Sequence, residues 1–167
     1  MDHRKVLYFT YISVQTQIID LQDQINNFKC TCAITDLYNL PDDYTYENQS
    51  FGSFFYKFYD RMDWNSAKTT CEGDGASLLV PRSIEENNFF AFLIETHEEM
   101  WLGINDIEIE GEFVDNDGKN ITFQNWNDGE PNDYMRREDV VVIRTNDGLW
   151  NDQKSNNKRR TLCVLFT

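Results

Sequence analysis

The chain has 167 residues, and its 29 acidic and 15 basic side chains give a formal net charge of −14. This balance argues against nucleic acid and anionic membranes as partners, because both are bound through basic patches. A content of 40% hydrophobic and 14% aromatic residues is enough for a folded core, and no apolar run approaches the ~20 residues that span a bilayer. We therefore expect one ordinary domain with an extension, no nucleic-acid partner and no membrane insertion.

Residues 1–50 are expected to form an N-terminal extension. Within residues 7–28, apolar and aromatic side chains alternate at spacings of four and three, which is the heptad rule of coiled coils. The pattern predicts a short coiled-coil neck that would assemble a homotrimer; a helix packed on its own domain and a processed leader fit it too. Residues 29–50 are predicted to be an irregular connector. The heptad positions are Leu7, Tyr11, Val14, Ile18, Leu21, Ile25 and Phe28.

Two helices are predicted early in the domain that follows, residues 51–167. Asp63 is a suitable N-cap for a first helix, which ends at one of the two glycines after Cys71. Ser83 and Glu86 form a capping box, and the second helix runs from there toward Glu95.

Strands are predicted mainly in the later part of the chain. The aromatic run FGSFFYKFY (51–59) precedes the helices, and the apolar run MWLGIND (100–106) indicates a buried strand. Short strands are expected at 140–144 and at TLCVLF (161–166), with a turn at 146–148. Helices early and strands late indicate an α+β fold, not an alternating βαβ fold.

The four cysteines are Cys30, Cys32, Cys71 and Cys163. Cys30 and Cys32 are too close for an easy mutual bridge, and we expect them to form interchain bridges if a neck is present. Cys71 and Cys163 could close most of the chain into one loop, while four reduced thiols remain the alternative. A zinc site is disfavoured because there is no CxxC motif and there are only two histidines.

Oxygen-bearing side chains cluster between Asp106 and Asp152. Calcium takes about six to eight such oxygens, and no twelve-residue window fits an EF-hand, so a calcium site would be assembled from several loops. Taken alone, the cluster fits a solvated acidic surface better. Its members are Asp106, Glu108, Glu110, Glu130, Asn132, Asp133, Glu138, Asp139, Asn151 and Asp152.

Six separated motifs, taken in their order along the chain, favour a calcium site over a solvated acidic surface. They are GSFFYKFYDRMDWNSAKTTC (52–71), GASLLVPRSIEENNFFAFLI (75–94), WLGI (101–104), GEPND (129–133), RED (137–139) and LWND (149–152). In this order they resemble the C-type lectin domain, most closely that of collectins such as mannose-binding proteins. The resemblance implies a C-type lectin-like fold: two helices, two small mostly antiparallel sheets and a long calcium-binding loop region. It also implies a disulfide between Cys71 and Cys163.

The resemblance further implies two calcium sites and a cis peptide bond before Pro131. The principal calcium would be held by Glu130, Asn132, Glu138, Asn151 and Asp152. The auxiliary calcium would be held by Asp106, Glu110, Asp133 and Asp139, with the carbonyl of Glu138.

Sugar recognition of the mannose type is implied by the same positions. Each of two vicinal hydroxyls would coordinate calcium, donate to a carboxylate and accept from a carboxamide N–H. Glu130 with Asn132, and Glu138 with Asn151, supply those pairs. The implied ligands are mannose, N-acetylglucosamine, fucose and glucose. Tyr134 either stacks on a sugar face or is only an exposed aromatic residue.

The chain departs from the family pattern in the segment that carries the last two ligands. The family's second disulfide would join cysteines near Val140 and Ser155, and both are missing. One extra residue lies between Asp139 and Trp150; we expect it in the turn at 145–148, because a shift of register would move Asn151 and Asp152 away from the ion. The basic run NKRRT (157–161) is interpreted as solvated surface.

The leading hypothesis is therefore a secreted or extracellular calcium-dependent lectin of recognition or defence. The alternative is a lectin-like module that binds protein or another surface, with calcium purely structural. An enzyme is disfavoured because His97 lies outside the acidic cluster and no serine or cysteine has a base partner. Asn48 and Asn120 stand in glycosylation sequons.

Overall fold

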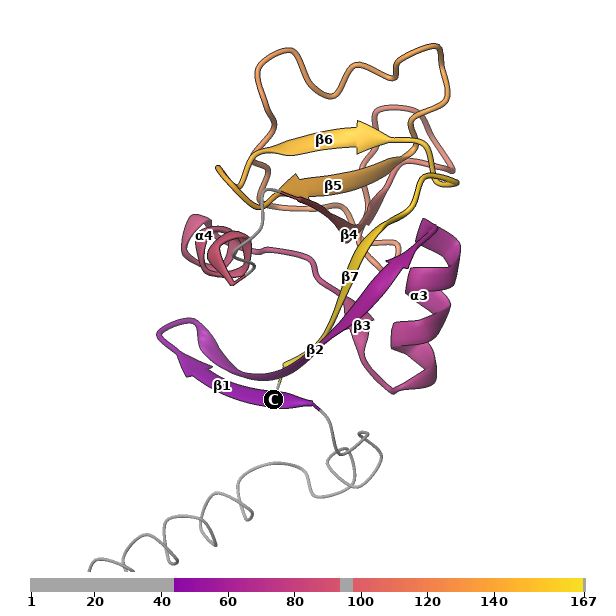
Figure 1. Cartoon of the computed structure of the whole chain (residues 1–167). Coiled ribbons are helices and arrows are strands. Elements are labelled where there is room, and N and C mark those ends of the chain that lie inside the picture. The colour runs from indigo at the N-terminus through magenta and orange to yellow at the C-terminus, as the bar shows by residue number, and fades with distance from the viewer. Residues whose placement is uncertain (1–43, 94–97, 167) are drawn as a thin grey trace, which may run out of the picture. The chain divides into compact units, whose positions relative to one another are not determined.

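The computed structural model describes residues 44–93 and 98–166. The predicted neck, Cys30, Cys32 and His97 lie outside these residues. The described elements, drawn in Figure 1, are β1 (Thr45–Gln49), β2 (Gly52–Met62), α3 (Trp64–Gly73), β3 (Ser77–Leu78), α4 (Ile84–Phe92), β4 (Glu99–Asn105), β5 (Val140–Arg144), β6 (Trp150–Gln153) and β7 (Arg159–Phe166).

The strands follow the order β1-β2-β7-β4-β5-β6, with β3 paired to β7. All pairings are antiparallel except β4 with β7, which run parallel and meet at Met100 and Arg160. Two antiparallel parts joined by this short parallel contact, with two helices beside them, confirm the predicted α+β fold.

β1 corrects the expectation that residues 29–50 are irregular throughout. Residues 45–49 pair along their whole length with the start of β2. The rings of Tyr46 and Phe55 lie 5.2 Å apart between the two strands, so cross-strand aromatic contact stabilises a segment whose polar residues obscure its strand character.

Both helix starts are confirmed. The Asp63 carboxylate accepts from the Ser66 N–H at 3.0 Å, and the Ser83 hydroxyl accepts from the Glu86 N–H at 3.2 Å. The Glu86 carboxylate does not complete the capping box at Ser83; it accepts from the N–H of Arg82 at 2.8 Å.

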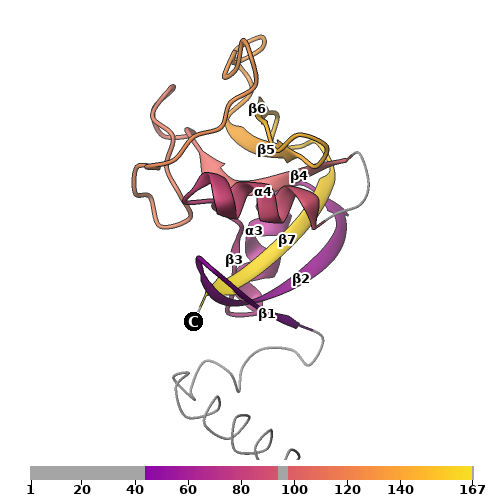
Figure 2. The same cartoon turned by 90° about the vertical axis from the view of Figure 1, so that its left-hand side faces the viewer.

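β4 and β5 are buried on both faces, which explains their continuous apolar sequences. Alternate residues point to opposite sides, so Met100 and Leu102 pack with α4, whereas Trp101 packs with α3. Figure 2 shows α4 in front of these strands and α3 behind them.

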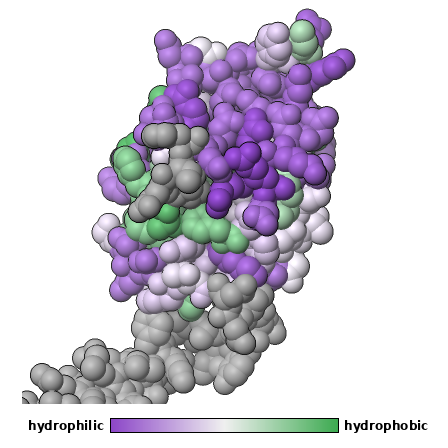
Figure 3. Space-filling view, viewed as in Figure 1, coloured by the Kyte–Doolittle hydropathy of each residue, from purple (hydrophilic) through white to green (hydrophobic). Residues whose placement is uncertain are grey.

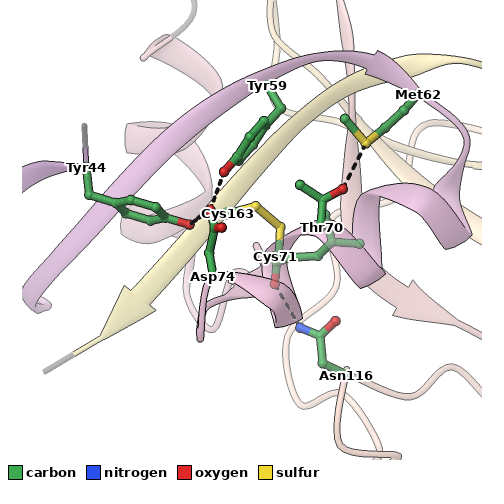
Figure 4. Close-up of a disulfide and its surroundings, with 9 residues drawn as sticks. Tyr44, Tyr59, Met62, Thr70, Cys71, Asp74, Asn116 and Cys163 are labelled. Atoms are coloured by element: carbon green, nitrogen blue, oxygen red, sulfur yellow. Dashed lines mark hydrogen bonds between the residues drawn. A yellow bond between two sulfur atoms is a disulfide. The ribbon is translucent and has the colours of Figure 1, made fainter. Parts of the chain in front are cut away.

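The Cys71–Cys163 disulfide joins α3 to β7 and is fully buried, with the two Cα atoms 5.1 Å apart. Beside it, the hydroxyls of Tyr44 and Tyr59 both donate to the Asp74 carboxylate just after α3 (Figure 4). The bridge implied by the resemblance is confirmed, and it ties the first helix to the last strand.

Candidate functional site

The long segment between β4 and β5, residues 106–139, is described throughout and contains neither helix nor named strand. It rises above β5 and β6 in Figure 1, and the surface over this part is predominantly hydrophilic (Figure 3). Asp106 follows β4 directly, Asp139 precedes β5, and Asn151 and Asp152 lie within β6. Three adjacent strands therefore carry predicted ligands to one end of the sheet.

The segment between Asp139 and Trp150, where the sequence predicts an extra residue, leads into a regular pairing of β5 with β6. Val141 pairs with Asp152 and Val142 with Asn151 in an unbroken antiparallel ladder. The connection between the strands is a turn in which the Gly148 N–H donates to the Arg144 carbonyl at 2.9 Å. The ladder therefore places Asp152 opposite the start of β5.

Other bonds hold the segment that lacks the second disulfide. The Trp64 N–H, at the start of α3, donates to the Ser155 carbonyl at 3.0 Å. At the other end, buried Asn87 donates to the Gly148 carbonyl at 2.9 Å and accepts from the Trp150 indole N–H at 2.7 Å. We therefore assign Asn87 a positioning role for β6, which sequence reasoning missed; its only signal was an asparagine inside an apolar helix pattern.

The Asp152 carboxylate meets the GEPND loop directly. It accepts from the backbone N–H of Asn132 at 3.0 Å and of Asp133 at 2.6 Å. The Asn132 side-chain amide donates to the Glu130 carboxylate, and the Glu130–Pro131 peptide bond is cis, as expected. Asp152, Asn132 and Glu130 are thus brought together from β6 and the loop.

Residues 133–138 form a loop closed by its own carboxylates. The Glu138 N–H donates to the Asp133 carboxylate at 3.1 Å, and the Glu138 carboxylate accepts from the Tyr134 N–H at 3.2 Å. Asp133, Met135 and Arg136 all have positive φ. Three non-glycine residues in this region of backbone space concentrate strain here, as is common at binding sites. The Tyr134 side chain is 58% exposed, with the Lys154 ammonium 5.8 Å from its ring.

The structure brings together some of the predicted ligands of the auxiliary calcium. The Asp106 carboxylate accepts from the Gly111 N–H at 2.8 Å, which closes the loop that carries Glu110, and the Asp106 N–H donates to the Asp139 carbonyl at 3.1 Å. Glu110 is exposed and close enough to feel the charges of Asp106 and Asp133.

Several carboxyl groups of the cluster hold their protons more tightly than usual. Burial, the hydrogen bond and charge of Asp152, and the charge of Glu138 raise the pKa of Glu130 to about 7. Burial is also the largest cause of the raised pKa values of Asp106, Glu110 and Glu138, with neighbouring carboxylates adding to it. Like charges gathered in a half-buried place favour a bound proton or a cation.

In the described part of the chain, no three acidic, histidine or cysteine side chains converge on a common metal position. Two atoms nevertheless fit calcium. The Oδ1 atoms of Asp106 and Asn151 are buried and have no hydrogen-bond partner among the described residues. One belongs to each predicted set, and an orphaned buried oxygen is costly unless something coordinates it. The donor set, all carboxylate and amide oxygens, suits this hard cation.

A model of the Lectin C-type domain matches residues 60–165. The chain therefore belongs to the C-type lectin domain family and contains the carbohydrate-recognition domain of that class. Proteins with such domains are generally carbohydrate binders without enzymatic activity, and the Cys71–Cys163 disulfide accords with their usual extracellular setting. In the residues that the structure describes, no helix is long and apolar enough to cross a membrane.

Solved structures agree with this fold. The cow C-type carbohydrate-recognition domain of CD23, determined in the presence of a GlcNAc2Man3 oligosaccharide, is 29% identical over 76% of this chain and 95% of its own, with a TM-score of 0.66. The mouse scavenger receptor C-type lectin domain is 24% identical over 75% and 97%, with a TM-score of 0.67. A calcium-independent type II antifreeze protein is 20% identical over 75% and 93%, with a TM-score of 0.65. The last two show the fold alone.

Proposed function

We propose that this domain binds mannose-type sugars in a calcium-dependent manner. The observation that carries the proposal is the hydrogen-bonded group of Glu130, Asn132 and Asp152. The orphaned buried oxygen of Asn151, the preceding residue in β6, supports it. The principal calcium would be held by Glu130, Asn132, Glu138, Asn151 and Asp152, and the auxiliary calcium by Asp106, Glu110, Asp133 and Asp139. The ion at the principal site would supply open coordination positions for two sugar hydroxyls.

The donors and acceptors of this chain would select the hydroxyl geometry. The Asn132 amide and the Glu130 carboxylate satisfy each other in the absence of sugar. A hydroxyl placed between them accepts from the amide and donates to the carboxylate, so both groups keep a partner. The second hydroxyl would accept from the Asn151 side-chain amide and donate to the Glu138 carboxylate. Mannose, N-acetylglucosamine and fucose present hydroxyls that suit this arrangement.

Localisation, glycosylation and oligomeric state are also proposed for this protein. We expect a secreted or extracellular protein of recognition or defence, glycosylated at Asn48 and Asn120, whose side chains are both exposed. The predicted homotrimer through residues 7–28 would raise working affinity through several weak sugar sites.

The direct test is retention on mannose–agarose with calcium, followed by EDTA. We expect retention that EDTA reverses. Retention that ignores EDTA, or none with calcium present, would remove the proposal. The double change Glu130→Gln with Asn132→Asp exchanges donor and acceptor and should shift preference from mannose to galactose.

The alternative, a lectin-like module that binds protein or another surface, predicts calcium binding without sugar binding. A calcium-independent type II antifreeze protein shares this fold, so the fold by itself does not imply calcium-dependent sugar binding. Calcium titration by calorimetry with and without mannose separates the two, because only the lectin proposal predicts that the sugar tightens calcium binding.

A further inference from the structure

A second charged region lies at the other end of β4 and β5. β4 begins at Glu99 and ends before Asp106, and β5 begins after Asp139 and ends at Arg144. A seven-residue strand spans about 20 Å, so the two ends are well separated. At the far end is a depression of about 400 Å³, here called the basic groove, with charged lining residues Arg61, Glu98, Glu99, Arg144, Lys158 and Arg159.

The basic groove has an excess of positive charge in a strongly acidic chain. Four of these six residues are cationic and two are anionic. Glu98 is shared between Arg61, at 2.7 Å, and Arg160, at 2.8 Å, while Glu99 pairs with Arg159 at 2.6 Å. Lys158 is exposed and has no ion pair within the described ranges. Arg144 is held by a different carboxylate, that of Asp147, at 2.6 Å. Carboxylates therefore fix the arginines in place, and Lys158 leaves the groove with an excess of positive charge.

The cations of the basic groove retain open donors. The Arg61 side chain is 61% exposed, and among the described residues its bond to Glu98 uses one of five guanidinium N–H groups. The remaining fork matches the oxygens of a sulfate or carboxylate group. Ion pairs that already hold the side chains reduce the ordering cost of binding.

We propose that the basic groove binds a polyanionic glycan through its sulfate or carboxylate groups, without calcium. Its cations come from β2, β5 and the segment that leads into β7, so several elements contribute to one depression, and the successive anions of a glycan chain can contact more than one of them. A glycan is favoured because the domain belongs to a carbohydrate-binding family. The groove lies outside the proposed calcium sites, so this inference does not depend on them.

The test uses the whole protein and immobilised heparin, a sulfated polysaccharide, in EDTA at low salt. We expect retention that rising NaCl reverses and that dextran sulfate, but not unsulfated dextran, competes away. Arg61→Gln with Lys158→Gln should weaken heparin binding about tenfold. The matched control, Lys68→Gln with Lys119→Gln, removes the same charge elsewhere and should leave binding unchanged.

Three results would overturn the proposal: no retention in EDTA, equal weakening by the control pair, or equally effective competition by polyglutamate, which would assign the groove to acidic peptides. Thermal unfolding of both double variants shows whether they are folded. Mannose–agarose retention in calcium should be the same in both variants and the parent protein.

Discussion

Around β2, β7 and α3, buried side chains such as Phe54 and Trp64 and the Cys71–Cys163 disulfide hold the fold. The loops at 106–111 and 129–139 are held instead by backbone N–H groups that donate to carboxylates. The first region gains stability by excluding water. The second gathers like charges, which cost energy unless protons or cations accompany them. Changes in pH and calcium should therefore act on the loops and leave the core largely unaffected.

The largest expected effect is loss of the disulfide. Cys71→Ala with Cys163→Ala opens a loop of 92 residues and should lower the free energy of unfolding by about 4–5 kcal/mol, since the cross-link restricts the unfolded chain. Urea denaturation with and without calcium measures it. Calcium should raise the free energy of unfolding of the variant by as much as it raises that of the parent protein. A smaller rise in the variant would show that the calcium loops depend on the disulfide-linked core.

Asn87→Ala should cost about 2 kcal/mol, because the Trp150 indole N–H loses its buried acceptor. The Gly148 carbonyl keeps a second donor, the Asn125 side chain, at 2.7 Å. If Asn87 positions β6, calcium affinity falls as well as thermal stability. Asn88→Ala, at the exposed neighbour, is the control and should change unfolding by no more than ~0.5 kcal/mol. Lower stability with intact calcium affinity would restrict Asn87 to a structural role.

Acid should weaken calcium binding. With the pKa of Glu130 at about 7, protons compete with the ion, and the apparent dissociation constant should rise about tenfold between pH 8 and pH 6. A carboxyl whose pKa is raised by folding adds stability as it is protonated. The calcium-free protein should therefore become more stable as the pH falls from about 8 toward 5. Calorimetry measures calcium affinity across this pH range, and thermal unfolding measures the stability of the calcium-free protein. If neither quantity changes with pH, the raised pKa of Glu130 is contradicted.

The smallest effect is expected at the exposed Tyr134. If its ring stacks on a sugar, Tyr134→Ala lowers mannose affinity about threefold, consistent with a partly exposed aromatic contact. Calcium affinity should be unchanged, since no ligand is removed. Competition binding with free mannose measures the change, and unaltered sugar affinity would leave Tyr134 as an exposed loop residue without a binding role.

The sequence predicted those features that local chemistry dictates. Asp63 and Ser83 have the side chains that cap helices, and two-sided burial of β4 leaves a continuous apolar run. β1 was missed because its pairing with β2, not its own composition, makes it a strand. The basic groove was missed for a similar reason: NKRRT was interpreted as solvated surface, and only the fold brings Arg61 and Arg144 to it.

The candidate site was predictable as a set of residues but not as an arrangement. Motif order predicted which residues belong to the candidate site, whereas the register of β6 and the bond from Trp64 to Ser155 depend on tertiary packing. These contacts bring Asp152 to Asn132 without the second disulfide.

Amide hydrogen exchange with and without calcium shows whether the loops at 106–111 and 129–139 form a calcium site. We expect protection of the Asn132 and Asp133 amides to rise more than tenfold with calcium, because the carboxylate that holds them becomes fixed. Amides of β2 and β7 should change little. Equal protection of the Asn132 and Asp133 amides with and without calcium would contradict the claim that these loops form a calcium site.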